Sequence, residues 1–428
     1  MTKYNTFTLD NGLRMIHLPS ASQVVWCGYE IAAGSRDEQP GEEGLAHFCE
    51  HMTFKGTERR SALQVINALE SVGGELNAFT NKEDTVFYAA VTKEHFAKAV
   101  ELLTDIVFHS EYPQQEIDKE VEVICDEIES YNDSPAELIY DEFENLLFEG
   151  HPLGHNILGK AELLRTFTTA DALRFTRRHY RPDNAVFFVY GDVDFKRLVK
   201  LLEKFTVDGL SSCVPAVASG KAERTDDLLA SPPSIQPQVY SSVNCKPSTV
   251  NKEIGTHQAH VMIGTQAYRY DDPRRMTLYL LNNILGGPGM NARLNLSLRE
   301  RHGLVYTVES SMASYSDTGV WSVYFGCDHH DITRCQRLVR RELDRVMLRP
   351  LSASQLSAAK KQLKGQLAIA CDNREQFALD FGRNFLHRGQ ERDLDVLFRR
   401  IDGVTAEDIQ QVANELFPTG HLTTLIIK

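Results

Sequence analysis

The stretch FTTADALRFTRRHYRPDNAVFFVYG, residues 167–191, indicates the fold, because a similar stretch follows later in the chain. The copy is VTAEDIQQVANELFPTGHLTTLIIK, residues 404–428, which aligns without a gap at an offset of 237 residues (404 − 167). Asp171 then falls on Asp408, and each copy closes on an apolar strand. A helix followed by a strand, repeated once at this distance, indicates a duplicated domain rather than a solenoid of short repeats.

A second pair of segments extends the duplication. AHVMIGTQAYRYDD, residues 259–272, resembles WCGYEIAAGSRDE, residues 26–38, because each is a strand that leads to an arginine and acidic residues. We therefore predict an α+β fold of two homologous domains, each a mostly antiparallel sheet with helices packed on one face. Residues 213–238 are rich in proline, serine, alanine and charge, so they are the predicted linker between domains at 1–212 and 239–428.

The composition is that of a globular protein. Of the 428 residues, 42% are hydrophobic and 25% are charged, and the length exceeds what one compact core usually holds. The net charge is −13 without a basic run, which argues against nucleic acid or an anionic membrane as a partner. The eight cysteines form no CxxC pair, and neither a signal peptide nor a membrane span is evident. We expect a cytoplasmic protein with reduced thiols.

The stretch GLAHFCEHMTFKG, residues 44–56, holds two histidines, a glutamate and a cysteine within five positions. On a helix, His47 and His51 are four residues apart and share a face, so both imidazoles can reach one metal ion. Glu50 lies beside that face and can hold a water molecule at the metal. Cys49 is turned about 200° from His47, so we assign it to packing. If it were exposed, it could instead sense oxidation.

A catalytic zinc site needs a third protein ligand beside an open position. EVEVICDEIESYNDSP, residues 120–135, offers one on a second helix. Glu120 and Glu127 are seven residues apart and share a face, so this helix could supply Glu127 as a ligand and Glu120 behind it. The alternative for Glu120 is a position at the start of a helix, where it would favour the helix dipole.

The second copy of the duplicated domain is an internal control for this cluster. PRRMTLYLLNNIL, residues 273–285, lies where the first copy has EGLAHFCEHMTF, and it has helical spacing without histidine or glutamate. A cluster that served folding would be expected in both copies. Its presence in one copy favours a chemical role.

The HxxEH order of residues 47–51 inverts the HExxH of thermolysin-type enzymes. At this point the chain resembles the pitrilysin/insulinase family of zinc metallopeptidases, and within it the small two-domain members that are similar to mitochondrial processing peptidase subunits. The resemblance covers essentially the whole chain. It includes GGELNA at 73–78, the helical pattern at 120–135 and HPLGHNILG at 151–159.

The resemblance implies a metal site residue by residue. It implies that His47, His51 and Glu127 bind one Zn²⁺ ion per chain. The family's third ligand follows the second histidine by some 76 residues, and Glu127 has this spacing (127 − 51). The resemblance also makes Glu50 the general base, and Glu120 matches an additional carboxylate of the family.

The resemblance continues in the second half of the chain. SLRERHGLVYTVES, residues 297–310, matches a pair that contacts the substrate in the family, here Arg299 and Tyr306. The GGPGMNARL stretch just ahead of it resembles the family's glycine-rich loop. Asn77 and Ala78 match the edge strand along which the substrate backbone lies. The simpler alternatives are a surface salt bridge for Arg299 and a core position for Tyr306.

These observations lead us to expect a zinc-dependent endopeptidase that hydrolyses unfolded peptides or flexible segments inside a dimeric chamber. Glu50 is expected to move the proton, while Tyr306 or Arg299 stabilises the oxyanion. We expect peptide substrates and a homodimer, with a heterodimer as the alternative. The rival hypotheses are a non-catalytic or partner-dependent subunit of a processing-peptidase-like heterodimer, and a metal-binding module without hydrolytic activity.

Overall fold

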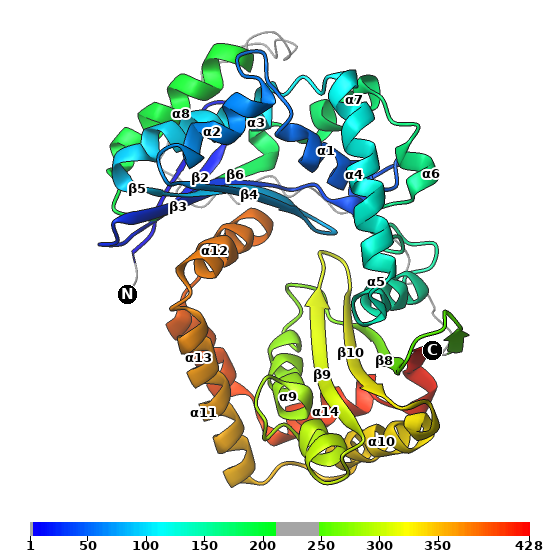
Figure 1. The fold of residues 1–428 in the computed structure, drawn as a ribbon. Coiled ribbons are helices and arrows are strands. Elements are labelled where there is room, and N and C mark those ends of the chain that lie inside the picture. The colour runs from blue at the N-terminus through cyan, green and yellow to red at the C-terminus, as the bar shows by residue number, and fades with distance from the viewer. Residues whose placement is uncertain (1–2, 211–247) are drawn as a thin grey trace. The chain divides into compact units, whose positions relative to one another are not determined.

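A computed structural model describes residues 3–210 and 248–428. The predicted linker, residues 213–238, lies outside the described residues, as do Cys213 and Cys245. The chain forms two compact units, each built on one sheet (Figure 1). The first unit holds Met1–Ile124, the described part of Ile157–Gln238, and Asn373–Arg392. The second unit holds Cys125–Asn156, the described part of Val239–Asp372, and Asp393–Lys428.

The sheet of the first unit has six strands. Their order across the sheet is β1 (Asn5–Thr8), β2 (Arg14–Pro19), β6 (Ala185–Gly191), β3 (Val24–Ile31), β5 (Thr85–Thr92) and β4 (Glu75–Thr80). Neighbouring strands are antiparallel except for β2 and β6, which run parallel. β4 is therefore an edge strand, with β5 as its partner on one side.

The sheet of the second unit repeats this plan with five strands. Their order is β7 (Thr249–Lys252), β11 (Thr423–Ile427), β8 (Ala259–Ala267), β10 (Gly319–Cys327) and β9 (Val305–Ser314). One pair, β7 and β11, is again parallel and sits in the same place as β2 and β6. β9 occupies the edge position that β4 has in the first unit. The predicted α+β fold with a duplicated, mostly antiparallel sheet is confirmed.

The two copies that reveal the duplication begin in the same way. α7 (Thr169–His179) leads to β6, and α14 (Ala406–Leu416) leads to β11. The backbone N–H of Thr168 donates to Asp171 at 2.9 Å, and that of Thr405 donates to Asp408 at 2.8 Å. Both helices thus start with a capping box, which satisfies backbone N–H groups that have no partner inside the helix.

Except for α4, each remaining helix belongs to one of the two units. The first unit contains α1 (Leu45–Thr53), α2 (Ala62–Glu70), α3 (Phe96–His109), α6 (Ala161–Leu164), α8 (Phe195–Leu210) and α12 (Arg374–Arg388). The second unit contains α5 (Pro135–Leu147), α9 (Arg275–Gly286), α10 (Ile332–Leu348), α11 (Ala353–Ala370) and α13 (Leu394–Gly403). α4 (Gln114–Asn132) is one continuous helix, and the division between the units passes through it after Ile124.

Both faces of the first sheet are covered. Tyr29 and Phe187 point to α3, where the Tyr29 hydroxyl lies 2.8 Å from the hydroxyl of Thr104. Phe188, next along β6, points to the opposite face and packs against Phe381 of α12, with ring centroids 6.3 Å apart. Figure 1 shows α2 and α3 on one side of this sheet and α12 on the other. α12 comes from the second half of the sequence.

Both faces of the second sheet are also covered by helices. Trp321 and Val323 of β10 pack with α9, α10 and α14, whereas Tyr324 packs on the other face with Phe143 of α5. Alternate residues of a strand point to opposite faces, so α5 lies across the sheet from the other helices. α5 comes from the first half of the sequence. The prediction of helices on one face therefore missed one helix per sheet.

No described helix combines the length and the apolar character that crossing a bilayer requires. The six described cysteines carry free thiols, and five of them are buried.

Candidate metal centre

The start of α1 is held by a carboxylate and a glycine. Glu38 accepts hydrogen bonds from the backbone N–H groups of Gly44 (3.0 Å) and Ala46 (2.7 Å). Gly44 has a φ of 95°, and a Cβ atom placed on it would lie 2.8 Å from the Cα atom of Gly159. Both the left-handed backbone and the close approach require glycine. The helix that follows is therefore rigidly placed, and eight of its nine residues are buried.

His47 and His51 lie one above the other on α1. Their ring centroids are 4.6 Å apart at an interplanar angle of 61°. Burial, together with the neighbouring His51, lowers the pKa of His47 to about 3. The His47 imidazole is therefore neutral at physiological pH, which is the form that binds a metal ion.

Glu127 approaches these two histidines from α4. One ligand atom from each of His47, His51 and Glu127 can be chosen so that all three lie within 4.8 Å of one another. His47 is buried, His51 is partly exposed and Glu127 is exposed, so solvent reaches one side of the group. Two imidazole nitrogens and one carboxylate oxygen form a ligand set of catalytic zinc sites. The donors brought together by the structure fit Zn²⁺.

Glu120 lies behind His51. One carboxylate oxygen is 3.1 Å from Nδ1 of His51, and the other is 2.6 Å from Nζ of Lys55. Burial raises the pKa of Glu120, but the hydrogen bonds from His51 and Lys55 outweigh it and hold this pKa below its usual value. Glu120 is the seventh residue of α4, away from the helix start. A helix-dipole role therefore does not explain its position.

Glu50 is buried beside the histidines and is held by a residue that the sequence did not point to. Its Oε2 atom accepts a hydrogen bond from the hydroxyl of Thr80 at 2.6 Å. Thr80 is the last residue of β4, so an edge strand and α1 together position the Glu50 carboxylate. No spacing rule links residues 30 apart on a strand and a helix, which is why the sequence did not reveal Thr80.

Cys49 faces away from this group, as predicted. Its thiol points to α7, where Sγ lies 3.9 Å from the carbonyl oxygen of Ala172. The side chain is fully buried, and burial raises the pKa of the thiol well above its usual value. Cys49 is therefore a packing residue, and the exposure that an oxidation sensor would need is absent.

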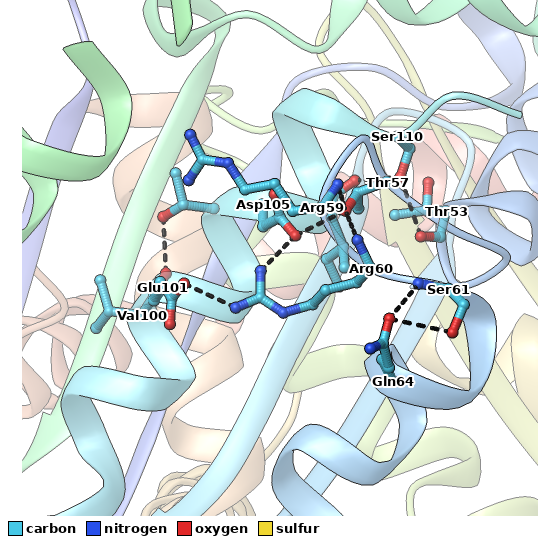
Figure 2. Close-up of polar contacts among 12 residues, drawn as sticks. Thr53, Thr57, Arg59, Arg60, Ser61, Gln64, Val100, Glu101, Asp105 and Ser110 are labelled. Carbon is cyan, nitrogen blue, oxygen red and sulfur yellow. Dashed lines mark hydrogen bonds and ion pairs between the residues drawn. The ribbon is translucent and has the colours of Figure 1, made fainter. Parts of the chain in front are cut away.

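The segment after α1 is tied to α3 by a second set of polar contacts. Asp105 accepts hydrogen bonds from Thr57 at 2.8 Å and from Arg60 at 2.5 Å. Arg60 also pairs with Glu101 at 2.7 Å. Figure 2 shows the Arg60 guanidinium between these two carboxylates. These contacts fix the chain that leaves α1 and are separate from the histidine pair.

Asn77 and Ala78 lie in the middle of β4. They pair with Tyr88 and Phe87 of β5, so the other edge of β4 has no strand partner among the described residues. Asn77 is exposed. An edge of this kind can accept an extended peptide through backbone hydrogen bonds.

Arg299 and Tyr306 belong to the second unit and lie together. The Arg299 guanidinium carbon is 5.6 Å from the centre of the Tyr306 ring, and Tyr306 is 83% exposed. The core position that was the alternative for Tyr306 is therefore wrong. Both residues line a pocket of about 560 Å³, which the glycine-rich segment Gly286–Met290 borders. Arg299 sits on a π-helical turn (Asn295–Glu300), a feature common at functional sites.

The counterpart of α1 in the second unit is α9, which lacks such a group. α9 buries leucines and asparagines and contains no histidine or glutamate. Elsewhere in residues 3–210 and 248–428, one further group of ligand-type side chains lies close together. It consists of Asp328, His330 and Asp331, which are exposed or partly exposed at the start of α10.

The chain is similar to known proteins over almost its whole length. The family model described as Insulinase (Peptidase family M16) matches residues 15–161, and the model described as Peptidase M16 inactive domain matches residues 166–363. The uncharacterized zinc protease YmxG of Bacillus subtilis is 31% identical over 98% of this chain and 97% of its own length. An uncharacterized zinc protease of Mycobacterium tuberculosis is 32% identical over 96% of this chain and 90% of its own.

Solved structures match the fold over the full length. A protease from Helicobacter pylori superimposes with a TM-score of 0.86 at 22% identity and covers 100% of both chains. A peptidase M16 inactive domain from Pseudomonas fluorescens has a TM-score of 0.84 at 18% identity, over 99% of this chain and 97% of its own. At these identities the likeness shows the fold alone.

Proposed function

The chain belongs to the insulinase family of peptidases, peptidase family M16, and from this premise we propose that it is a zinc-dependent endopeptidase. The observation that carries the proposal is the meeting of His47, His51 and Glu127 beside a buried Glu50. That group combines a three-ligand metal site with a carboxylate placed to move a proton.

The metal ligands of the proposal are His47, His51 and Glu127, for one Zn²⁺ ion per chain. When bound, zinc polarises the scissile carbonyl and lowers the pKa of a nearby water molecule. Glu120 orients His51, because one of its carboxylate oxygens lies 3.1 Å from Nδ1, and the proposal places the metal at Nε2 of the ring.

Glu50 is the proposed general base. It accepts a proton from the attacking water and returns it to the amine that leaves the cleaved bond. The hydrogen bond from Thr80 holds one carboxylate oxygen of Glu50 and so fixes the orientation of the carboxylate. Holding the base in one orientation lowers the entropic cost of the proton transfer.

The proposed substrates are unfolded peptides or flexible polypeptide segments. The free edge of β4 at Asn77 and Ala78 supports this choice, because backbone pairing requires an extended chain and reads few side chains. Arg299 and Tyr306 are proposed to contact the same substrate and to stabilise the oxyanion of the tetrahedral intermediate. Their exposure on the wall of a pocket supports a role in binding.

We propose that the active form is a homodimer that encloses its substrate in a chamber. The support is that one chain carries both the metal group and the Arg299–Tyr306 pair. A non-catalytic subunit, or one dependent on a different partner, is the alternative. Such a subunit would not need the buried Glu50 with its Thr80 hydrogen bond.

The proposal can be tested with the purified full-length chain. It should contain about one zinc ion per chain and cleave an unstructured fluorogenic peptide. Addition of a chelator should abolish this activity. Glu50→Gln should keep the metal and reduce turnover by at least about a hundredfold. Glu122→Gln, on the exposed side of α4, is the control and should cleave normally. Turnover by Glu50→Gln at the wild-type rate would refute the role of Glu50.

The assembly needs a separate measurement. Light scattering after size-exclusion chromatography should give twice the chain mass of 48.3 kDa. A monomer that still cleaves the peptide would rule out the chamber, while leaving the zinc peptidase activity in place.

A further inference from the structure

The turn between β4 and β5, residues 81–84, follows directly after Thr80. The turn is closed by two contacts between Asn81 and Asp84. The Asn81 backbone N–H donates to the Asp84 carbonyl at 2.8 Å, and its side-chain amide donates to the Asp84 carboxylate at 2.6 Å. Whatever fixes Asp84 therefore also fixes the end of β4, where Thr80 holds Glu50.

Asp84 is held from α12, some 300 residues further along the chain. Its carboxylate accepts hydrogen bonds from Arg383 at 3.0 Å and from His387 at 3.1 Å. Arg383 and His387 are four residues apart, so they reach Asp84 from one face of α12. Burial raises the pKa of Asp84, but His387 and Arg383 outweigh burial and hold its pKa below the usual value. Asp84 is only 3% exposed and stays charged.

The turn is also held by the segment after β3. The Ser35 backbone N–H donates to the carbonyl of Asn81 at 3.1 Å, and that of Arg36 donates to the carbonyl of Lys82 at 2.9 Å. Arg36 and Glu83 form an ion pair. The turn is therefore held both by the segment after β3 and by α12.

α12 itself has little room to shift. A Cβ atom on Gly382 would lie 2.8 Å from the Glu30 carboxylate and 3.0 Å from the Phe188 ring, so α12 packs directly against the sheet. The Arg383 guanidinium also lies 5.9 Å from the centre of the Phe79 ring of β4. A helix seated this closely can hold Asp84 in one position.

We propose that Asp84, clamped by Arg383 and His387, is a positioning residue for the proposed base: it fixes the β4–β5 turn, and through Thr80 it fixes the carboxylate of Glu50. This inference rests on the proposed peptidase function. It assigns to α12, which lies outside the first half of the sequence, a part in orienting the base. Neither Asp84 nor α12 contacts the metal ligands in this scheme.

The first test removes the Thr80 hydroxyl. Thr80→Val keeps the shape of the side chain and deletes the hydrogen bond, whereas Thr80→Ser keeps the hydroxyl. We expect Thr80→Val to lower kcat at least about tenfold with KM and zinc content unchanged. Thr80→Ser should recover most of kcat. Equal kcat values for wild type and Thr80→Val would overturn the proposal.

The second test compares two buried aspartates. Asp84→Asn removes the charge that Arg383 and His387 hold. Asp105→Asn is the matched control, because Asp105 is also 3% exposed and also pairs with an arginine, but it anchors the segment after α1 to α3. Both variants should lose stability. Only Asp84→Asn should lower kcat, by about tenfold, when both are assayed fully folded.

A double variant checks that the two effects share one path. If Asp84 acts through Thr80, adding Asp84→Asn to Thr80→Val should lower kcat little further. Independent, multiplied losses would contradict the proposal, and so would an equal loss of kcat in Asp105→Asn.

Hydrogen exchange supplies a readout that does not depend on activity. Asp84→Asn should speed exchange of the Asn81 amide relative to wild type, and Asp105→Asn should not. If wild type proves inactive, the peptidase function fails, but faster exchange in Asp84→Asn alone would still establish the clamp. Unchanged exchange at Asn81 would refute the clamp whatever the activity.

Discussion

The Nδ1 atom of His51 lies 3.1 Å from a carboxylate oxygen of Glu120, and this contact decides which nitrogen of the ring is available to a metal ion. An ionised carboxylate only accepts hydrogen bonds, so Nδ1 is the donor of this contact and a metal ion would bind at Nε2. The pair also orients the ring plane. One glutamate thus sets both the tautomer and the direction of the ligand.

Glu120→Gln should weaken zinc binding about 10- to 100-fold, because the amide no longer provides a charged acceptor for His51. The affinity can be measured by competition with a chromophoric chelator. Glu122→Gln is the matched control, since Glu122 lies on the same helix with its side chain 63% exposed and pairs with Arg165. Equal affinities of the two variants would show that Glu120 does not support the ligand.

Substitutions of Cys49 and Glu127 should have different effects on zinc binding. Cys49→Ala should keep the full zinc content and lose about 1–2 kcal/mol of unfolding free energy, because it empties part of the packed contact with α7. Glu127→Ala should lose most of the zinc while keeping its fold, since Glu127 is exposed. Metal analysis gives the zinc content of each variant, and urea unfolding gives its unfolding free energy. A loss of zinc in Cys49→Ala would contradict the geometry of α1.

Glu30 predicts a dependence of stability on pH. It is fully buried, and neither carboxylate oxygen has a hydrogen-bond partner. Burial, and next the charge of Asp84, raise the pKa of Glu30 well above the ordinary glutamate value of 4.5. The folded chain therefore keeps this proton at pH values where the unfolded chain releases it. The neutral Glu30 carboxyl contributes its full stability below pH 4.5, and this contribution is lost as the pH rises towards the raised pKa of Glu30.

Glu30→Gln replaces the titrating carboxyl by a neutral amide. As pH rises, wild type should lose unfolding free energy and the variant should not, so the variant should become more stable relative to wild type. The difference should grow by up to about 1.4 kcal/mol per pH unit within the window. Urea unfolding at several pH values measures it. Glu342→Gln is the control, because Glu342 is equally buried but pairs with Arg345 at 2.7 Å. A constant difference between Glu30→Gln and wild type at every pH would disprove the account.

α5, which comes from the first half of the sequence but packs on the second sheet, should contribute strongly to the stability of the second unit. Phe143 is 1% exposed and packs on the face of the second sheet that α9, α10 and α14 leave open. Phe143→Ala should cost about 3–5 kcal/mol of unfolding free energy. Ile369→Ala, at a 74% exposed position, should change it by less than about 0.5 kcal/mol. A small effect of Phe143→Ala would mean that α5 is not part of the folded unit.

Local patterns were predictable wherever neighbours in sequence are neighbours in space. The four-residue spacing of His47 and His51 and the seven-residue spacing of Glu120 and Glu127 follow from the period of a helix. The hairpin of β4 and β5 and the strands β2 and β3 coincide with short runs rich in apolar and β-branched residues, a local property of the sequence. The helical spacing runs on through residues 114–147, whereas the structure ends α4 at Asn132 and starts α5 at Pro135.

The sequence alone predicted the duplication, the α+β class, the shared face of His47 and His51 and the shared face of Glu120 and Glu127, because helix and strand periods are short-range properties of the chain. That the two pairs meet was implied by the family resemblance, not by any local period. The hydrogen bond of Thr80 to Glu50 and the contacts of Asp84 with Arg383 and His387 became evident only in the folded structure. The folded structure also decided that α5 and α12 each cover the sheet formed mainly by the other half of the sequence. Such contacts join residues tens to hundreds of positions apart. They depend on which buried surfaces fit together, and no local period carries that information.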